Sequence, residues 1–361
     1  AYVYPRATKH IKEMVALVKK LLKKDYAYKA EDDSIYYDIS KFKDYGKLSK
    51  IKLKNLKSVS KVCTDEYTKE QAHDFALWKA WTPKDKKVFW KTEIGKGRPG
   101  WHLECSVMSM KYLGKTFDIH TGGVDLIFPH HENEIAQAEA ATGKQFVKYW
   151  LHNEWLLVEG KKMSKSLGNF YTLRDLLEKG YDPLAIRYVL LSTHYRTKLN
   201  FTFKELDSAK NIIERFQEFM LRLKKYKGKK HNKKINTLIK KAKKDFEKHM
   251  NNDLNISPAL AAVFNFIKKV NKLITDKKIS TKDAKQAYTQ MLKFDKVLGL
   301  KLKSVKQKKK LSKKHKELIK EREKLRKQRK WKQADKIREQ LKKEGIVLED
   351  ADGKTKWRRV K

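Results

Sequence analysis

Cysteine is the scarcest chemically reactive residue in this sequence. Only Cys63 and Cys105 occur among the 361 residues, and two thiols are too few for a disulfide framework. Their scarcity excludes a small secreted domain that depends on disulfide bonds for its stability. We therefore expect a reducing compartment and predict a cytoplasmic protein.

Long apolar runs are also missing. No stretch approaches the roughly 18 consecutive apolar residues that would span a bilayer. The opening residues AYVYPRATKH lack the apolar segment of a secretory signal. The sequence therefore predicts no membrane partner.

Negative charge is scarce relative to positive charge. The chain has 43 Asp and Glu residues against 87 Lys and Arg residues, which gives a formal net charge of +44. Such a field attracts polyanions, meaning nucleic acid or an acidic membrane surface. A lysine-biased proteome whose charges simply face water would leave the same composition. Between these interpretations, the charge balance favours a nucleic-acid-binding protein.

The pattern of apolar residues divides the chain near residue 200. Before this point, residues 26–40 indicate a β-hairpin, 95–100 a glycine-rich loop, 116–123 a buried strand and 129–143 a helix. Alternating strands and helices are typical of a parallel α/β sheet. Beyond this point the pattern is helical, until residues 345–361 indicate a small hairpin.

One short segment concentrates metal-ligand chemistry. His130 and Glu134 are four residues apart, so on a helix they share a face, and both side chains are zinc ligands. Cys105, on the preceding predicted helix, can add a thiolate and leave a fourth position open. The alternative is an ordinary helix-face pair beside a small core cysteine. Spacing alone also leaves His131 and His102 eligible as ligands.

Residues 162–166 read KMSKS within a glycine-flanked loop. Two lysines around small hydroxyl groups on a mobile loop suit a triphosphate. They can close on it and stabilise the charge that develops on pyrophosphate. In a lysine-rich chain the same five letters also arise by chance.

These segments together carry a family resemblance. The stretches DFALWKAW, GKGRPGWHLECSVMSMKYLG, FDIHTGGVDLIFPHHENEIAQAEAATG, KKMSKSLGNF, YDPLAIRYVLLSTHYR and GIVLED resemble cysteinyl-tRNA synthetases, which are class I aminoacyl-tRNA synthetases. The resemblance runs from about Pro5 to the C-terminus. It implies a ligase that activates L-cysteine with ATP and Mg²⁺ to cysteinyl-adenylate and transfers the cysteinyl group to tRNA(Cys).

The resemblance also implies an architecture. We expect a partial α/β Rossmann-like class I core, an all-α helical bundle, and a small C-terminal anticodon-binding region. The expected boundaries are 1–205 for the core, 206–300 for the bundle and 301–361 for the C-terminal region. Within the core, about 20–95 would be an inserted connective segment, and 155–200 would hold the KMSKS loop and a stem-contact region.

In this family one zinc ion per chain selects the thiolate of the substrate over the hydroxyl of serine, which a plain pocket separates poorly. The resemblance assigns the zinc to Cys105, His130 and Glu134. It assigns the cysteine pocket to Trp101 and His120, which are otherwise a core aromatic and a core histidine.

Further roles follow from the same resemblance. It assigns the neighbourhood of the adenosine to Gly123 and Asp125, although Asp125 could merely cap a turn. It assigns the ATP phosphates to Lys162, Ser164 and Lys165. The anticodon-reading residues would be Arg326, Trp331, Asp335 and Asp350, a mix of charge and stacking surface that suits splayed-out bases. The alternative for these four is a salt-bridged helix with one packed tryptophan.

The sequence departs from the family in two ways. It contains no H-x-G-H motif, and it lacks the cysteine that supplies the fourth zinc ligand. Cys63 lies within the expected insertion, where we interpret it as a bystander. These departures predict a truncated or split chain that is a poor catalyst alone, with a separate chain as one source of the missing N-terminal half.

Three other interpretations compete. A non-catalytic RNA-binding relative would also lack the motif. A ligase that joins cysteine to an amino sugar would not need the RNA-binding tail. A nicotinamide-dependent oxidoreductase would use Gly95, Gly97 and Gly100 as its G-x-G-x-x-G turn, but Arg98 and Pro99 crowd that turn, and proline removes an amide that a phosphate would use.

Overall fold

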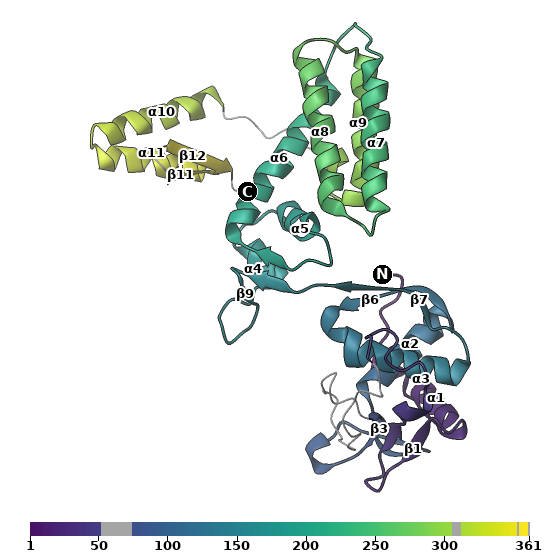
Figure 1. Ribbon diagram of the computed structural model, residues 1–361. Helices are drawn as coiled ribbons and strands as arrows, with labels where there is room; N and C mark the ends of the chain where they lie inside the picture. Colours follow the sequence, from purple (N-terminus) through teal and green to yellow (C-terminus); the bar gives the residue numbers. More distant parts are fainter. Residues whose placement is uncertain (52–73, 305–311, 352–353, 360–361) are drawn as a thin grey trace.

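The computed structural model describes residues 1–51, 74–304, 312–351 and 354–359. Cys63 lies outside the described residues. Figure 1 shows an α/β body, a bundle of long helices and a small C-terminal unit. A narrow region that includes strand β7 (Val147–Asn153) joins the first two. Among the described residues, no helix combines the length and the apolar composition needed to cross a bilayer.

The chain begins with a short 3₁₀ turn and an amphipathic helix, α1 (Ile11–Lys23), which packs onto an antiparallel sheet. The sheet has the strand order β1-β2-β3-β5-β4, with β1 (Ala27–Lys29), β2 (Ile35–Tyr37), β3 (Phe75–Ala80), β4 (Trp90–Thr92) and β5 (Gly95–Pro99). The antiparallel pairing of β1 with β2 confirms the predicted hairpin.

The loop predicted over residues 95–100 is wrong, because most of that stretch is strand β5. The glycines there permit close backbone packing. A Cβ on Gly97 would stand 2.1 Å from the Lys79 carbonyl oxygen, and one on Gly100 would stand 1.9 Å from that of Ala76. Because β5 pairs antiparallel with β3 and β4, these glycines do not form the dinucleotide-binding turn of an oxidoreductase, which follows a parallel strand.

The predicted parallel α/β unit is confirmed. The chain runs through α2 (Trp101–Leu113), β6 (Phe117–Gly123), two short helical turns, α3 (Glu132–Thr142) and β7 (Val147–Asn153). β6 and β7 pair in parallel, with His120 opposite Trp150. The prediction of a buried strand is wrong for β6, since Ile119 is 56% exposed. Parallel strands are buried only when both faces are covered, and the described residues leave part of this pair open.

A three-stranded sheet follows, with the order β10-β8-β9. Its strands are β8 (Leu156–Val158), β9 (Lys161–Lys162) and β10 (Leu199–Phe201). Between β9 and β10 lie the KMSKS loop, α4 (Leu173–Glu178) and α5 (Pro183–Ser192). Asp182 caps α5 by accepting from the Leu184 amide, and Pro183 opens its first turn.

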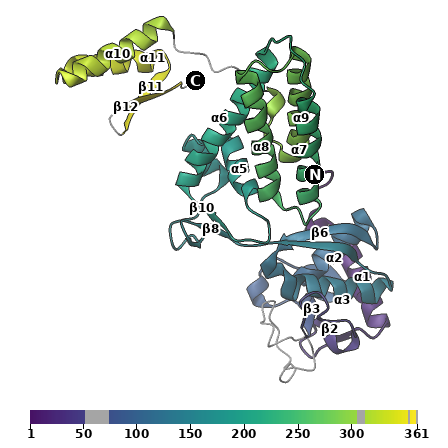
Figure 2. The ribbon, with the colours of Figure 1, turned by 45° about the horizontal axis from the view of Figure 1, so that its top comes forward.

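The helical pattern beyond residue 200 is confirmed as a bundle (Figures 1 and 2). Its helices are α6 (Phe203–Lys225), α7 (Lys234–Met250), α8 (Ile256–Thr275) and α9 (Thr281–Leu298). Their apolar faces meet in the largest core of the molecule, which includes Phe216, Val263 and Phe294.

The C-terminal unit is built on a small core that holds Leu341, Ile346 and Leu348. It contains α10 (Lys313–Lys327), α11 (Trp331–Lys343), β11 (Ile346–Ala351) and β12 (Lys354–Arg359). The two strands pair antiparallel, which confirms the predicted hairpin.

Candidate active site

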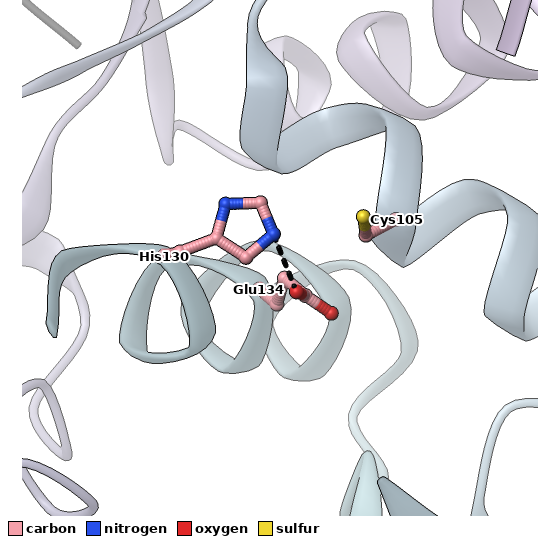
Figure 3. Close-up of side chains that lie close together, drawn as sticks. All are labelled: Cys105, His130 and Glu134. Carbon is pink, nitrogen blue, oxygen red and sulfur yellow. Dashed lines mark ion pairs between the residues drawn. The ribbon is translucent and has the colours of Figure 1, made fainter. Parts of the chain in front are cut away.

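Two neighbouring helices bring Cys105, His130 and Glu134 together (Figure 3). Their ligand atoms all lie within 4.8 Å of one another. His130 lies in the helical turn Ile127–His131, which leads into α3, and Glu134 lies in the first turn of α3. His130 Nε2 lies 2.9 Å from Glu134 Oε1. Gln137 holds α3 against α2, since its Nε2 donates to the His102 carbonyl at 2.6 Å and to Ser106 Oγ at 2.8 Å.

Glu134 is fully buried, yet neither of its carboxylate oxygens receives a hydrogen bond from a described residue. Burying a carboxylate without compensation is costly. Two of the nearby imidazoles, His102 and His131, carry no positive charge at neutral pH. Burial, reinforced by the other histidines, lowers the pKa of His102 to about 3 and that of His131 to about 2. The site therefore has the chemistry of a cation-binding centre.

Cys105 is half-buried on α2 and faces the same centre. Burial raises the pKa of its thiol to about 12, and the charges of Glu134 and Glu104 add to the shift. The thiol therefore stays protonated at neutral pH in the metal-free chain. A bound cation reverses this electrostatic balance, because coordination favours the thiolate.

The histidines that spacing left eligible have distinct positions. His102 Nδ1 lies 2.8 Å from His130 Nδ1, so it contacts the ring nitrogen that faces away from Glu134. His131 Nε2 lies 4.0 Å from Glu134 Oε1, and His120 Nδ1 lies 3.7 Å from Oε2. His120, His131 and Glu134 form a second ligand set, so Glu134 is common to both.

His152 is a site residue that sequence reasoning missed. Its Nε2 lies 2.8 Å from His131 Nδ1. The parallel register, which sets His152 of β7 opposite Gly122 of β6, brings it there. Gly122 is needed for the same approach, because a Cβ on it would stand 2.5 Å from His131 Cε1.

Trp101 and His120 both border the cluster of Cys105, His130 and Glu134. The Trp101 ring lies 4.3 Å from the His130 ring and is 46% exposed, so it is not an ordinary core aromatic. His120 stacks on Trp150, with their ring centroids 4.6 Å apart.

Gly123 and Asp125 follow the carboxyl end of β6. Asp125 is exposed in the short turn after the strand. A Cβ on Gly123 would stand 2.3 Å from Asp125 Oδ1, so the glycine admits this side chain close to the backbone.

The KMSKS loop is closed by one asparagine. Asn169 Oδ1 accepts from the Ser164 amide at 2.9 Å, and Asn169 Nδ2 donates to the Lys162 carbonyl at 3.1 Å. Lys162 and Lys165 are exposed, at 5.8 Å from the Trp155 ring and 5.7 Å from the Phe170 ring. Figures 1 and 2 both show the loop after β9 away from α2 and α3, so the structure does not bring it to Cys105, His130 and Glu134.

In the C-terminal unit, the Arg326 guanidinium lies 6.0 Å from the ring centroid of Trp331, which is 54% exposed. Asp335 is exposed one turn further along α11. Asp350 lies in β11, and its side chain is outside the description. The structure thus brings together Arg326 and Trp331 of the predicted set.

Comparison with known families divides the chain into three matched segments. The family described as the tRNA synthetases class I (C) catalytic domain matches residues 1–211. The DALR domain matches residues 245–303, and the cysteinyl-tRNA ligase anticodon binding domain matches residues 308–358.

Curated relatives match along nearly the whole chain. The cysteine–tRNA ligase of Chlamydia muridarum is 44% identical over 366 residues, which cover 98% of this chain and 76% of the relative. That of Brachyspira hyodysenteriae is 45% identical over 369 residues, which cover 99% of this chain and 77% of the relative.

A solved structure supports the fold. The Mycobacterium tuberculosis methionyl-tRNA synthetase in complex with methionyl-adenylate aligns with a TM-score of 0.56 at 14% identity. The alignment covers 80% of this chain and 71% of that chain.

Proposed function

This chain belongs to the cysteine–tRNA ligase family of class I aminoacyl-tRNA synthetases, and on that premise we propose which residues bind its metal, its amino acid and its nucleotide. The chain is a ligase that charges tRNA with cysteine. The anticodon-binding match favours this enzyme over a ligase that acts on an amino sugar.

We propose that Cys105, His130 and Glu134 hold one Zn²⁺ ion per chain. The observation that carries this proposal is the buried Glu134 carboxylate, which lacks a hydrogen-bond donor among the described residues and has a thiol and an imidazole within 4.8 Å. Sulfur, nitrogen and oxygen are the donor atoms that zinc prefers. Three protein ligands leave a fourth coordination position for the substrate. A zinc ion held by these residues would act as a Lewis acid toward the sulfur of the substrate cysteine.

This arrangement gives a physical basis for amino-acid selection. Serine differs from cysteine by one atom, and an apolar pocket rejects such an isostere weakly. A soft thiolate is a much better zinc ligand than a neutral hydroxyl. We assign Trp101 and His120 to the walls of this pocket, because both rings border the cluster.

We assign the ATP phosphates to Lys162, Ser164 and Lys165. Both lysines are exposed, so their ammonium groups are available to a Mg²⁺-bound triphosphate. Their charge would stabilise the pyrophosphate that leaves when the cysteine carboxylate attacks the α-phosphate. We assign Gly123 and Asp125 to the adenosine, because ligands of open parallel sheets lie beyond the carboxyl ends of the strands.

We assign Arg326, Trp331, Asp335 and Asp350 to the anticodon, and we keep the division at 1–205, 206–300 and 301–361. The guanidinium and the indole, 6.0 Å apart, offer planar surfaces for unstacked bases. The chain spans about three quarters of the curated relatives' length. A separate chain for an N-terminal half has no support in these comparisons, and we do not propose one.

Metal content tests the zinc proposal, and the chain's two cysteines provide matched variants. Cys105→Ser should lose most of the bound zinc, because a neutral hydroxyl replaces a thiolate. Cys63→Ser should keep about one zinc per chain, as should the unchanged protein, since three ligands and an open position define such a site. Elemental analysis after gel filtration measures both. Equal zinc in the two variants, or no zinc in the unchanged protein, would refute this ligand set.

A further inference from the structure

A basic cavity lies at the end of the helical bundle farthest from the α/β body. Its volume is about 690 Å³. We call it the distal basic pocket and define it by its five cationic side chains, which come from the end of α6, the α6–α7 loop and the α8–α9 loop: Arg222, Lys227, Lys229, Lys230 and Lys277. Tyr226, Gly228, Ile274 and Thr275 complete its lining, and none of these described lining residues is acidic.

The backbone that carries these lysines is held in place by the start of α9. The Thr281 amide donates to the Gly228 carbonyl at 2.8 Å, and the Gly228 amide donates to Thr281 Oγ1 at 3.2 Å. Gly228 is required here, because a Cβ would stand 2.4 Å from the Ile279 carbonyl oxygen. His231, just after the lysines, lies 2.7 Å from the buried carboxylate of Asp283. The loop is therefore ordered before any ligand arrives, which lowers the entropic cost of binding.

Two neutral side chains hold the Arg222 guanidinium in place, so they do not neutralise its charge. Its guanidinium donates to Asn271 Oδ1 and to Thr275 Oγ1, both at 2.9 Å. A guanidinium has five N–H donors, and it pairs with phosphate in a bidentate geometry. Two acidic side chains nearby are already engaged: Asp276 lies 3.5 Å from Lys278 Nζ, and Asp283 accepts from the Ser280 and Asn232 amides. An anion entering the pocket would therefore meet excess positive charge.

The position of the pocket indicates the size of the ligand. α8 begins beside the α/β body, where Ile256 lines the same cavity as Thr121 of β6 and Leu151 of β7. The helix has 20 residues, so its far end is about 30 Å away. Figures 1 and 2 show this end of the bundle pointing away from the α/β body. A ligand shared by both places must be a long polyanion.

We propose that the distal basic pocket binds the phosphodiester backbone of the tRNA that the α/β body charges. This inference rests on the proposed function, because it takes the tRNA as the polyanion that the chain engages. Lysine and arginine contacts to phosphates position a nucleic acid without reading its sequence. The pocket would therefore contribute affinity and orientation and leave amino-acid activation untouched.

The test is tRNA affinity at several salt concentrations, measured with a Lys229→Gln/Lys277→Gln variant. Neutralising two phosphate contacts should raise the Kd roughly three- to tenfold at about 0.1 M salt and flatten its salt dependence. Lys229→Arg/Lys277→Arg should restore the affinity. The matched control is Lys241→Gln/Lys243→Gln on α7, which removes equal charge from lysines already paired with Asp245 and Glu247 and should change the Kd less.

An unchanged Kd, or an equal change in the control, would overturn the proposal. Binding to phosphatidylserine vesicles should be measured with the same variants. A Lys229→Gln/Lys277→Gln variant that loses affinity for the vesicles but not for tRNA would also overturn the proposal, because it would identify a membrane surface as the ligand. Cysteine-dependent exchange of pyrophosphate into ATP separates this inference from the proposed function. If the exchange is absent in every variant while the Kd shift remains, the assignment of the activation site fails and the pocket stands.

Discussion

At the scale of single residues, two neighbouring glutamates of α3 contrast sharply. Glu132 is buried, and its carboxylate accepts from the Gly46 amide at 2.9 Å and the Ser49 amide at 2.7 Å. Glu134 is equally buried, but its oxygens lack such donors among the described residues. The fold therefore satisfies the carboxylate of Glu132 with two amides, whereas that of Glu134 has the close contact with His130 but no hydrogen bond from a described residue.

This contrast yields a stability prediction for the metal-free chain. Glu134→Gln removes a buried charge that receives no hydrogen bond from a described residue and should stabilise the chelator-treated protein by about 1–3 kcal/mol. Glu132→Gln should instead destabilise it, because the amide nitrogen that replaces one carboxylate oxygen cannot accept a hydrogen bond from the backbone amide there. Urea unfolding in the presence of EDTA measures both. A Glu134→Gln variant that is less stable than the unchanged chain without metal would show that the carboxylate is satisfied without a cation.

Helical spacing predicted that His130 and Glu134 share a face, because the helical period is a local property, and family resemblance added Cys105 from another helix. Neither predicted His152, which reaches His131 only through the register between β6 and β7. Pairing register across separate strands depends on non-local packing, and no local pattern around His152 encodes it.

At the scale of elements, α9 shows how a capping residue stabilises the bundle. Ser280 and Asp283 form a reciprocal capping box, and the buried carboxylate also accepts from the Asn232 amide. Burial alone would raise the pKa of Asp283, but hydrogen bonds from Ser280, Asn232 and His231 lower it overall. The lowered pKa means that the ionised carboxylate stabilises the native state.

Asp283→Asn should therefore destabilise the chain in a pH-dependent way. Because the folded-state pKa lies below the unfolded value of about 3.9, the stabilisation is present above that value and disappears as pH falls through the folded pKa. We expect a loss of about 2 kcal/mol near pH 7 that shrinks toward pH 3. Urea unfolding across this range, with Asp276→Asn as the exposed control, measures the difference. A loss that is constant with pH would contradict the role of the ionised carboxylate.

Other elements mark where sequence patterns succeed and where they fail. The 3.6-residue period predicted the helical bundle and a helix over residues 129–143, where α3 spans Glu132–Thr142, because that period is a property of a single helix. The strand β5 was predicted as a loop because its glycines and proline are typical of turns. They instead permit close contact with the backbone of β3, which is a tertiary requirement.

At the scale of the whole molecule, the excess of positive charge and the arrangement of the α/β body, the bundle and the C-terminal unit both suit the binding of one long polyanion. The net charge of +44 attracts a long polyanion to a chain whose metal cluster and C-terminal unit lie on separate bodies. Composition predicted that partner, and family resemblance predicted the order of the parts. The location of the distal basic pocket required the structure, because its cations come from segments about 50 residues apart in the chain, such as Lys229 and Lys277.

The central claim is that a metal held by Cys105, His130 and Glu134 takes the sulfur of the substrate as a further ligand. Cobalt(II) can replace zinc in such sites and reports sulfur coordination through its charge-transfer absorption. Adding L-cysteine to the cobalt-loaded chain should increase that absorption until the site saturates, whereas L-serine should leave it unchanged. An absorption that does not respond to L-cysteine, or that responds equally to L-serine, would contradict the account.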